Sequence, residues 1–164
     1  MMGHEPAFAA LPAEEQAQIL LLADGSIGRA KLLCDAKERK PHIARREQAD
    51  ALVLALLKTR DSTAKVAQLN LLTAKKDSAA SGGKREELLA LLCEVQSALR
   101  DLILLKRAET VSLGFYTDRD AARELCDSTS VQGLLLLYDR VENTRRQLLR
   151  NANVRLALTA LLLT

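Results

Sequence analysis

The residues that could perform chemistry include two histidines and three cysteines, but their spacing disfavours a metal or catalytic centre. His4 lies near the N-terminus and His42 follows a proline, and neither has a partner at metal-ligand spacing. Cys34, Cys93 and Cys126 are odd in number and form no CxxC pair. We therefore expect reduced cysteines that pack as small apolar side chains in a cytoplasmic protein, with no metal site.

Phosphate-binding loops and acid–base pairs are also missing from the sequence. No GxxxxGK[ST] or GxGxxG pattern occurs, and the adjacent Gly82 and Gly83 are too short a run to cradle a phosphate. The carboxylates are scattered among Lys and Arg, which is typical of a solvated surface. No apolar run is long enough to span a membrane, and the N-terminus does not resemble a secretion signal. These patterns predict a chain with no catalytic residues, no cofactor and no small-molecule substrate.

The composition predicts an all-α fold. Hydrophobic residues make up 48% of the chain, yet aromatic residues make up only 2%, so the apolar content is mainly Leu and Ala. These residues lose little conformational freedom in a helix, whereas the β-branched and aromatic residues that favour strands are scarce. We expect helices over residues 12–23, 27–38, 43–59, 62–76, 85–106, 119–126, 130–149 and from about 151 to the C-terminus.

Two breaks in this pattern predict the domain organisation. The residue before a proline is disfavoured in helical geometry, so Pro41 should end a helix and residues 37–41 should form a hinge. The expected domains are therefore residues 1–40 and 41–164. Residues 77–84 are small, polar and Gly-rich, which favours a loop.

The most regular hydrophobic pattern lies in residues 85–106. Apolar residues there recur at steps of four and three, as on one face of a helix. The stripe consists of Leu88, Leu92, Val95, Leu99 and Leu102, widened by Leu91, Ala98 and Leu105. This helix should lie at the centre of the core. The final helix instead has apolar residues on more than one face, at positions 154, 156, 158, 161, 162 and 163, which favours burial against a partner.

The net charge of +3 conceals an uneven distribution. Residues 1–28 hold four acids and no Lys or Arg, residues 29–85 hold fourteen Lys or Arg against six acids, and residues 86–164 hold ten against eleven. The basic segment could face nucleic acid or an acidic partner, or could simply be solvated helix surface, which is the simpler interpretation. The scarcity of aromatic residues disfavours a surface that stacks single-stranded bases.

The first of three motifs is LLLADGSIGRAKLL, residues 20–33. Gly25 should close one helix, Ser26 should cap the next, and Gly28 would permit a close backbone approach. The motif resembles the last helices of the small AAA+ subdomain, the lid, in clamp-loader subunits. In the ATP-hydrolysing members an arginine two places after the Ser reaches the phosphate, whereas here Arg29 stands one place later. The resemblance thus implies a shifted, non-functional arginine; the alternative is a helix hairpin with a surface arginine.

The second and third motifs are LRDLILLKR, residues 99–107, and LLRNANVRLALTALLL, residues 148–163. Similar strings occur in the delta-prime subunits of bacterial DNA polymerase III clamp loaders, in a long helix of the collar domain and at its C-terminal end. Arg100 and Asp101 should lie toward the margin of the core, where they solvate the helix or pair within the chain. The third motif contains Asn151, Asn153 and Arg155, and either asparagine could bond the free amides of the last helix.

The order of the three motifs resembles that of the delta-prime family over most of the chain. The resemblance implies part of an AAA+ lid in residues 1–40 and a helical collar, which mediates oligomerisation, in residues 41–164. It also implies a non-catalytic stator from a longer subunit of the DNA polymerase III holoenzyme, a DNA-directed DNA polymerase. Its partners would be the delta and gamma/tau subunits, with DNA contacted only indirectly. The alternatives are a delta or gamma/tau collar, or an unrelated helical adaptor or nucleic-acid-binding module.

Overall fold

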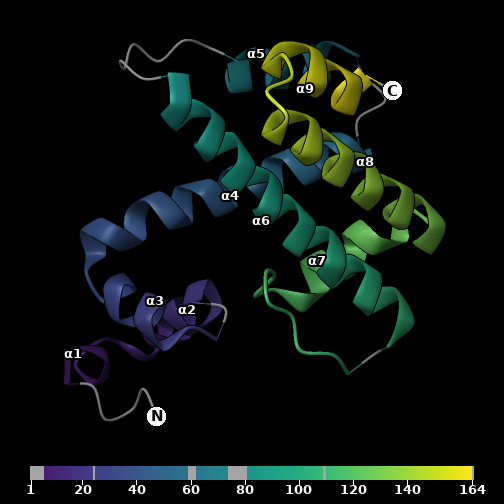
Figure 1. Ribbon diagram of the computed structural model, residues 1–164. Helices are drawn as coiled ribbons and strands as arrows, with labels where there is room; N and C mark the ends of the chain where they lie inside the picture. The colour runs from purple at the N-terminus through teal and green to yellow at the C-terminus, as the bar shows by residue number, and fades with distance from the viewer. Residues whose placement is uncertain (1–5, 24, 59–61, 74–80, 109, 164) are drawn as a thin grey trace. The chain divides into compact units, whose positions relative to one another are not determined.

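The computed structural model describes residues 6–23, 25–58, 62–73, 81–108 and 110–163, and every regular element in these ranges is a helix (Figure 1). The prediction of an all-α fold is confirmed. The helices are α1 (Pro6–Ala9), α2 (Ala13–Ala23), α3 (Ile27–Leu33), α4 (Ala36–Lys58), α5 (Ser62–Thr73), α6 (Ser81–Arg107), α7 (Arg119–Asp127), α8 (Val131–Leu149) and α9 (Val154–Leu163).

Contacts within the chain define two compact units, unit 1 (Met1–Glu47) and unit 2 (Gln48–Thr164). The division lies inside α4, whereas the sequence placed a domain boundary between residues 40 and 41. In unit 1, α2 packs against α3 around a small apolar core. Its members are Phe8, Ile19, Leu22, Ala23, Ala30 and Leu33.

The predicted end of a helix at Pro41 is wrong, because α4 continues through this residue. The α3 helix ends at Leu33 rather than at residue 38, and only two residues separate it from the next helix, which begins at Ala36. Asp35 caps that helix, since its Oδ1 accepts a hydrogen bond from the Lys37 amide at 2.8 Å. Pro41 therefore lies in the second turn, where its missing N–H removes a single hydrogen bond. The preference against helical geometry before proline is a bias that the rest of a long helix overcomes, so residues 37–41 are helical and form no hinge.

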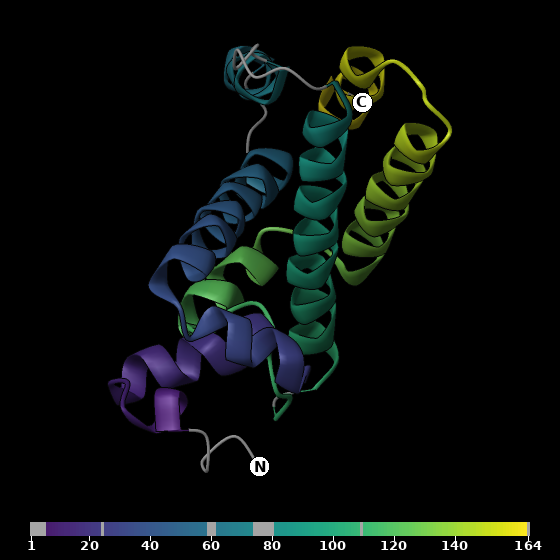
Figure 2. The ribbon, with the colours of Figure 1, turned by 60° about the vertical axis from the view of Figure 1, so that its left-hand side comes forward.

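Unit 2 is built around α6, which packs against α7 and α8, while α9 packs against α5 and α8 (Figures 1 and 2). The predicted stripe on α6 is confirmed. All five of its principal residues, from Leu88 to Leu102, are buried in the main core, as are Leu91 and Ala98, and Leu105 is partly buried. The core also takes residues from α4, including Leu52 and Val53.

The loop predicted over residues 77–84 is wrong for residues 81–84, which form the first turn of α6. Residues 77–80 lie outside the described part of the chain. Glycine weakens a helix interior by about 1 kcal/mol relative to alanine, but Gly82 and Gly83 stand where the helix has not yet formed its internal hydrogen bonds. Lys84 also fixes this turn, because its Nζ donates to the Thr73 carbonyl at the end of α5 at 3.0 Å.

One face of α8 packs against the core of unit 2. Ser130 caps this helix by accepting a hydrogen bond from the Gly133 amide at 3.0 Å, as expected for a helix that starts there. However, Leu135 is 41% exposed, and the neighbouring Leu134 is buried instead. The buried residues of α8 are Leu134, Leu137, Val141, Thr144 and Leu148. Because residues 134–137 are all leucine, hydrophobicity alone does not indicate which of them face the core.

The two asparagines between α8 and α9 have different structural roles. Asn153 caps α9, because its Oδ1 accepts a hydrogen bond from the Leu156 amide at 3.1 Å. Asn151 instead ends α8 in left-handed geometry, with a φ of 62°. The Asn151 amide donates to the Leu148 carbonyl and the Ala152 amide to the Gln147 carbonyl, which is the Schellman arrangement. The prediction that one of them bonds the start of the last helix is thus confirmed for Asn153.

Candidate interaction surface

The first motif forms a tight connection between α2 and α3 in unit 1. Gly25 has a φ of +78°, which glycine adopts without strain, and Ser26 accepts a hydrogen bond from the Arg29 amide at 3.3 Å. The Arg29 guanidinium lies 3.4 Å from Nδ1 of His42 within the same unit. A side chain at position 28 would meet open space, so no close backbone approach explains Gly28, contrary to the expectation from the sequence.

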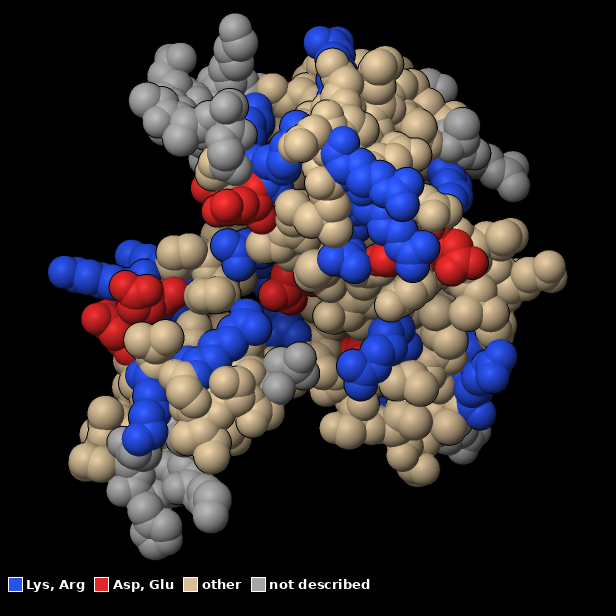
Figure 3. Space-filling view, viewed as in Figure 1, with Lys and Arg blue, Asp and Glu red and all other residues tan. Residues whose placement is uncertain are grey.

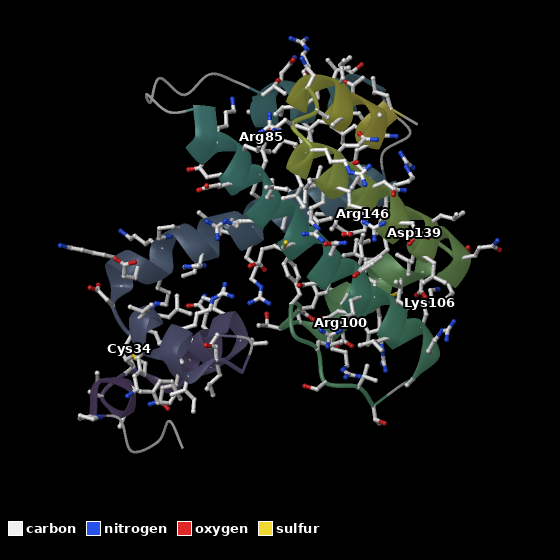
Figure 4. The ribbon with its side chains drawn as sticks, viewed as in Figure 1. Cys34, Arg85, Arg100, Lys106, Asp139 and Arg146 are labelled. Atoms are coloured by element: carbon white, nitrogen blue, oxygen red, sulfur yellow. The ribbon has the colours of Figure 1, made fainter. Side chains whose placement is uncertain are left out.

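The second motif places its two charged residues in different environments in unit 2. Arg100 is exposed, as predicted, and is labelled in Figure 4. Asp101 is only 1% exposed, so its predicted position at the margin of the core is wrong. Its Oδ2 accepts hydrogen bonds from the Phe115 amide at 2.6 Å and the Tyr116 amide at 3.2 Å. A buried carboxylate is tolerated when amides satisfy it, and this one holds the segment between α6 and α7 against α6.

Two further buried groups near Asp101 are poorly suited to catalysis. Burial, with the carboxylates of Asp50 and Asp101, raises the pKa of the Tyr116 hydroxyl above its usual value. Burial also raises the pKa of the Cys126 thiol, which donates to the Leu102 carbonyl at 3.3 Å. Both groups stay protonated at neutral pH, so neither is a ready base or nucleophile.

Among the residues described, neither the Tyr116 hydroxyl nor Oδ1 of Asp50 has a hydrogen-bond partner of normal geometry, although the two groups are close enough to interact electrostatically. Within the described residues, no three His, Cys, Asp or Glu side chains lie close enough together to hold a metal ion. The two amide bonds of Asp101 connect α6 to the segment that precedes α7.

Glu142 forms a second polar connection, between α6 and α8. Its carboxylate accepts hydrogen bonds from Gln96 Nε2 at 2.9 Å, Arg145 Nε at 2.9 Å and Arg146 Nε at 2.8 Å. The hydrogen bond from Arg145, followed by those from Gln96 and Arg146, lowers the pKa of Glu142 to about 2. Because Gln96 belongs to α6, this cluster fixes the two longest helices of unit 2 to each other as well as balancing local charge.

The final helix has an apolar face that its own unit leaves uncovered. Leu158, Leu161 and Leu162 are buried, whereas Leu156 is 70% exposed and Leu163 is 45% exposed. Leu156, Ala160 and Leu163 follow one another at steps of four and three, so they lie on one side of α9. We call these three residues the α9 outer face. The excess of apolar residues noted in the sequence of the last helix is thus exposed in part.

An arginine-rich segment, residues 140–155, runs from α8 into α9 and holds five Arg against a single acid, Glu142. Figure 3 shows a band of Lys and Arg side chains over α8, where Figure 4 labels Arg146. Arg146, Arg150 and Arg155 are exposed, and we call them the arginine surface. The near-zero net charge of residues 86–164 conceals this surface, because acids elsewhere in that range balance it. The local charge over one or two helical turns is the sequence signal that identifies it.

Comparisons of this chain with models of known protein families, with curated proteins and with solved structures found no match. In the described ranges none of the helices is both long enough and apolar enough to cross a membrane. The α9 outer face and the arginine surface are the features of unit 2 that point most directly to a binding partner.

Proposed function

We propose that this chain is a non-catalytic assembly element of a bacterial DNA polymerase III clamp loader, corresponding to the delta-prime subunit. Its partners would be the delta and gamma/tau subunits, and its role would be to hold ATPase modules in place while the sliding clamp is loaded onto primed DNA. The three sequence motifs support this identification, because they occur in the order of the delta-prime family. Gly25 and Ser26 form a helix junction, as such a lid motif requires.

The observation that carries the proposal is the α9 outer face. A leucine side chain gains about 1.5–3 kcal/mol on full burial, and Leu156 and Leu163 are two such side chains on one side of a helix. Permanent interfaces between subunits are large and apolar, like a core divided in half. An exposed leucine pair on α9 is consistent with a face that another subunit covers.

The chemistry of the buried polar groups also favours a structural role. Asp101 is engaged by two backbone amides, and the raised pKa values of Tyr116 and Cys126 keep both side chains neutral. The Arg29 guanidinium lies 3.4 Å from Nδ1 of His42 and is thus engaged within the chain. In the proposed assembly the ATPase activity would belong to neighbouring subunits.

Reconstitution with purified subunits tests this proposal. The chain is mixed with delta and gamma/tau and analysed by size-exclusion chromatography at low salt and near half-molar salt. We expect co-elution at both, because an apolar contact depends little on ionic screening. A complex that forms only at low salt, or none at all, would contradict the proposal. An unrelated nucleic-acid-binding module would instead bind DNA and none of the subunits.

A further inference from the structure

Two of the three arginines of the arginine surface, Arg150 and Arg155, carry charge that no described acidic side chain balances, whereas Arg146 pairs with Glu142. Arg146 lies in the last turn of α8, and Arg150 directly follows the helix with its amide bonded to the Arg146 carbonyl at 3.1 Å, so the two like charges lie one turn apart. The Arg146 Nε bonds Glu142, whereas the side chains of Arg150 and Arg155 have no hydrogen bond or ion pair with another described residue. Only one carboxylate, that of Glu142, lies within residues 140–155.

The start of α9 adds to this excess. Arg155 lies in the first turn of that helix, which holds no acidic residue. The backbone dipole already makes a helix start positive, so a cation there is unfavourable and an anion is favourable. The Schellman turn at Asn151 and the Asn153 cap fix the chain between Arg150 and Arg155. The two arginines are thus attached to a well-defined junction that is short of negative charge.

The residue types indicate what kind of anion would bind. The planar guanidinium group matches phosphate with paired hydrogen bonds, and asparagine side chains such as those of Asn143 and Asn151 commonly contact phosphate and sugar. No aromatic residue occurs in residues 140–155, so stacking on unpaired bases has no support. The segment also lacks the Trp and Tyr side chains that accompany arginine in many protein-interface hot spots.

We infer that the arginine surface binds the phosphate backbone of duplex DNA directly and without sequence preference. This contact goes beyond the proposed function, in which DNA is reached only indirectly, and it does not depend on that function. It would give the chain two separate surfaces, an apolar one on α9 for protein and a basic one over the α8–α9 junction for DNA.

The test measures binding of the whole chain to a fluorescently labelled mixed-sequence duplex by anisotropy over a range of salt concentrations. The Arg150→Ala/Arg155→Ala variant should bind at least roughly tenfold more weakly at low salt. Its slope of log affinity against log salt should be shallower by about 1.8, since each phosphate contact contributes about 0.9. The control variant is Arg100→Ala/Arg123→Ala, which removes the same charge from exposed positions on α6 and α7 and should bind like the parent.

Two results would overturn the inference. The first is equal DNA binding by the parent and the Arg150→Ala/Arg155→Ala variant, with circular dichroism showing that both are folded. The second is displacement of the duplex by polyglutamate of matched charge concentration, which would identify an acidic protein as the preferred ligand. Either result would leave the proposed assembly with delta and gamma/tau untouched, because the chain is assayed alone.

Discussion

The α6–α7 side of unit 2 and its α8–α9 side are both rich in leucine, but they use it differently. On α6 every residue of the main stripe is buried, and the one buried charge, Asp101, is satisfied by two amides. On α9 two leucines face outward, and Arg150 and Arg155 carry exposed charge nearby in the chain. The α6–α7 side buries its main leucine stripe and satisfies its buried carboxylate within the chain. The α8–α9 side leaves leucine and arginine side chains exposed. Stability should therefore depend on α6, subunit binding on the α9 outer face, and DNA binding on the arginine surface.

The largest contrast is expected from truncating leucines on the two sides. Leu99→Ala and Leu102→Ala should each lower the free energy of unfolding by about 2–5 kcal/mol, because each leaves a cavity in the core. Leu156→Ala should change it by less than about 0.5 kcal/mol, because its side chain is mostly exposed. Urea unfolding of the three variants measures this directly. Similar losses at all three positions would remove the distinction between the two sides.

The next effect concerns the buried carboxylate of Asp101. Asp101→Ala should cost about 1–3 kcal/mol, because it leaves the buried Phe115 amide and the partly buried Tyr116 amide without an acceptor. Asp101→Asn is the matched control: it keeps a carbonyl oxygen in a similar position and should lose less. Thermal unfolding compares the two. An alanine variant as stable as the parent would mean that water replaces the carboxylate and that this connection adds little.

A smaller effect is expected from Glu142, and it should depend on pH. The pKa of its carboxyl is about 2 in the folded protein, below the ordinary value of about 4.3. The ion pairs therefore stabilise the fold above about pH 4.3 and lose their contribution as the pH falls toward 2. The parent should exceed Glu142→Gln by about 1 kcal/mol at pH 7, a modest value because the pairs are partly exposed.

Unfolding of the parent and Glu142→Gln between pH 7 and pH 2 checks this. The difference in free energy should be constant at neutral pH and shrink below about pH 4.3. A difference that does not change with pH would show that the hydrogen bonds, not the carboxylate charge, connect α6 to α8.

The sequence predicted most of the helices and the central stripe, because periodic leucines over many turns identify one face of a helix. The sequence predicted the wrong structure where the preference of one or two residues opposed the formation of a longer helix. The local preference at Pro41 predicts a helix end there, although Asp35 caps the helix that contains this proline. Gly82 and Gly83 suggested a loop, although a first helical turn tolerates glycine. The burial of Asp101 was not predictable, since its two amide donors lie fourteen and fifteen residues away in an irregular segment.

Of the two candidate surfaces, the sequence predicted the apolar one in part and did not predict the arginine surface. The sequence indicated the apolar excess of the last helix, because too many of its positions are apolar for one face. It did not indicate which leucines stay exposed, which depends on how α9 packs against α5 and α8. The near-zero net charge of residues 86–164 conceals the arginine surface.

Replacing Leu156 in the reconstituted assembly tests the central claim most directly. Leu156→Asp puts a charge on the α9 outer face, and Leu136→Asp puts the same charge on an exposed leucine of α8 as a control. Both variants should fold like the parent. The account predicts that Leu156→Asp fails to co-elute with delta and gamma/tau near half-molar salt, whereas Leu136→Asp still does. Co-elution of both variants with the subunits, to the same extent as the parent, would contradict the assignment of α9 as the assembly face.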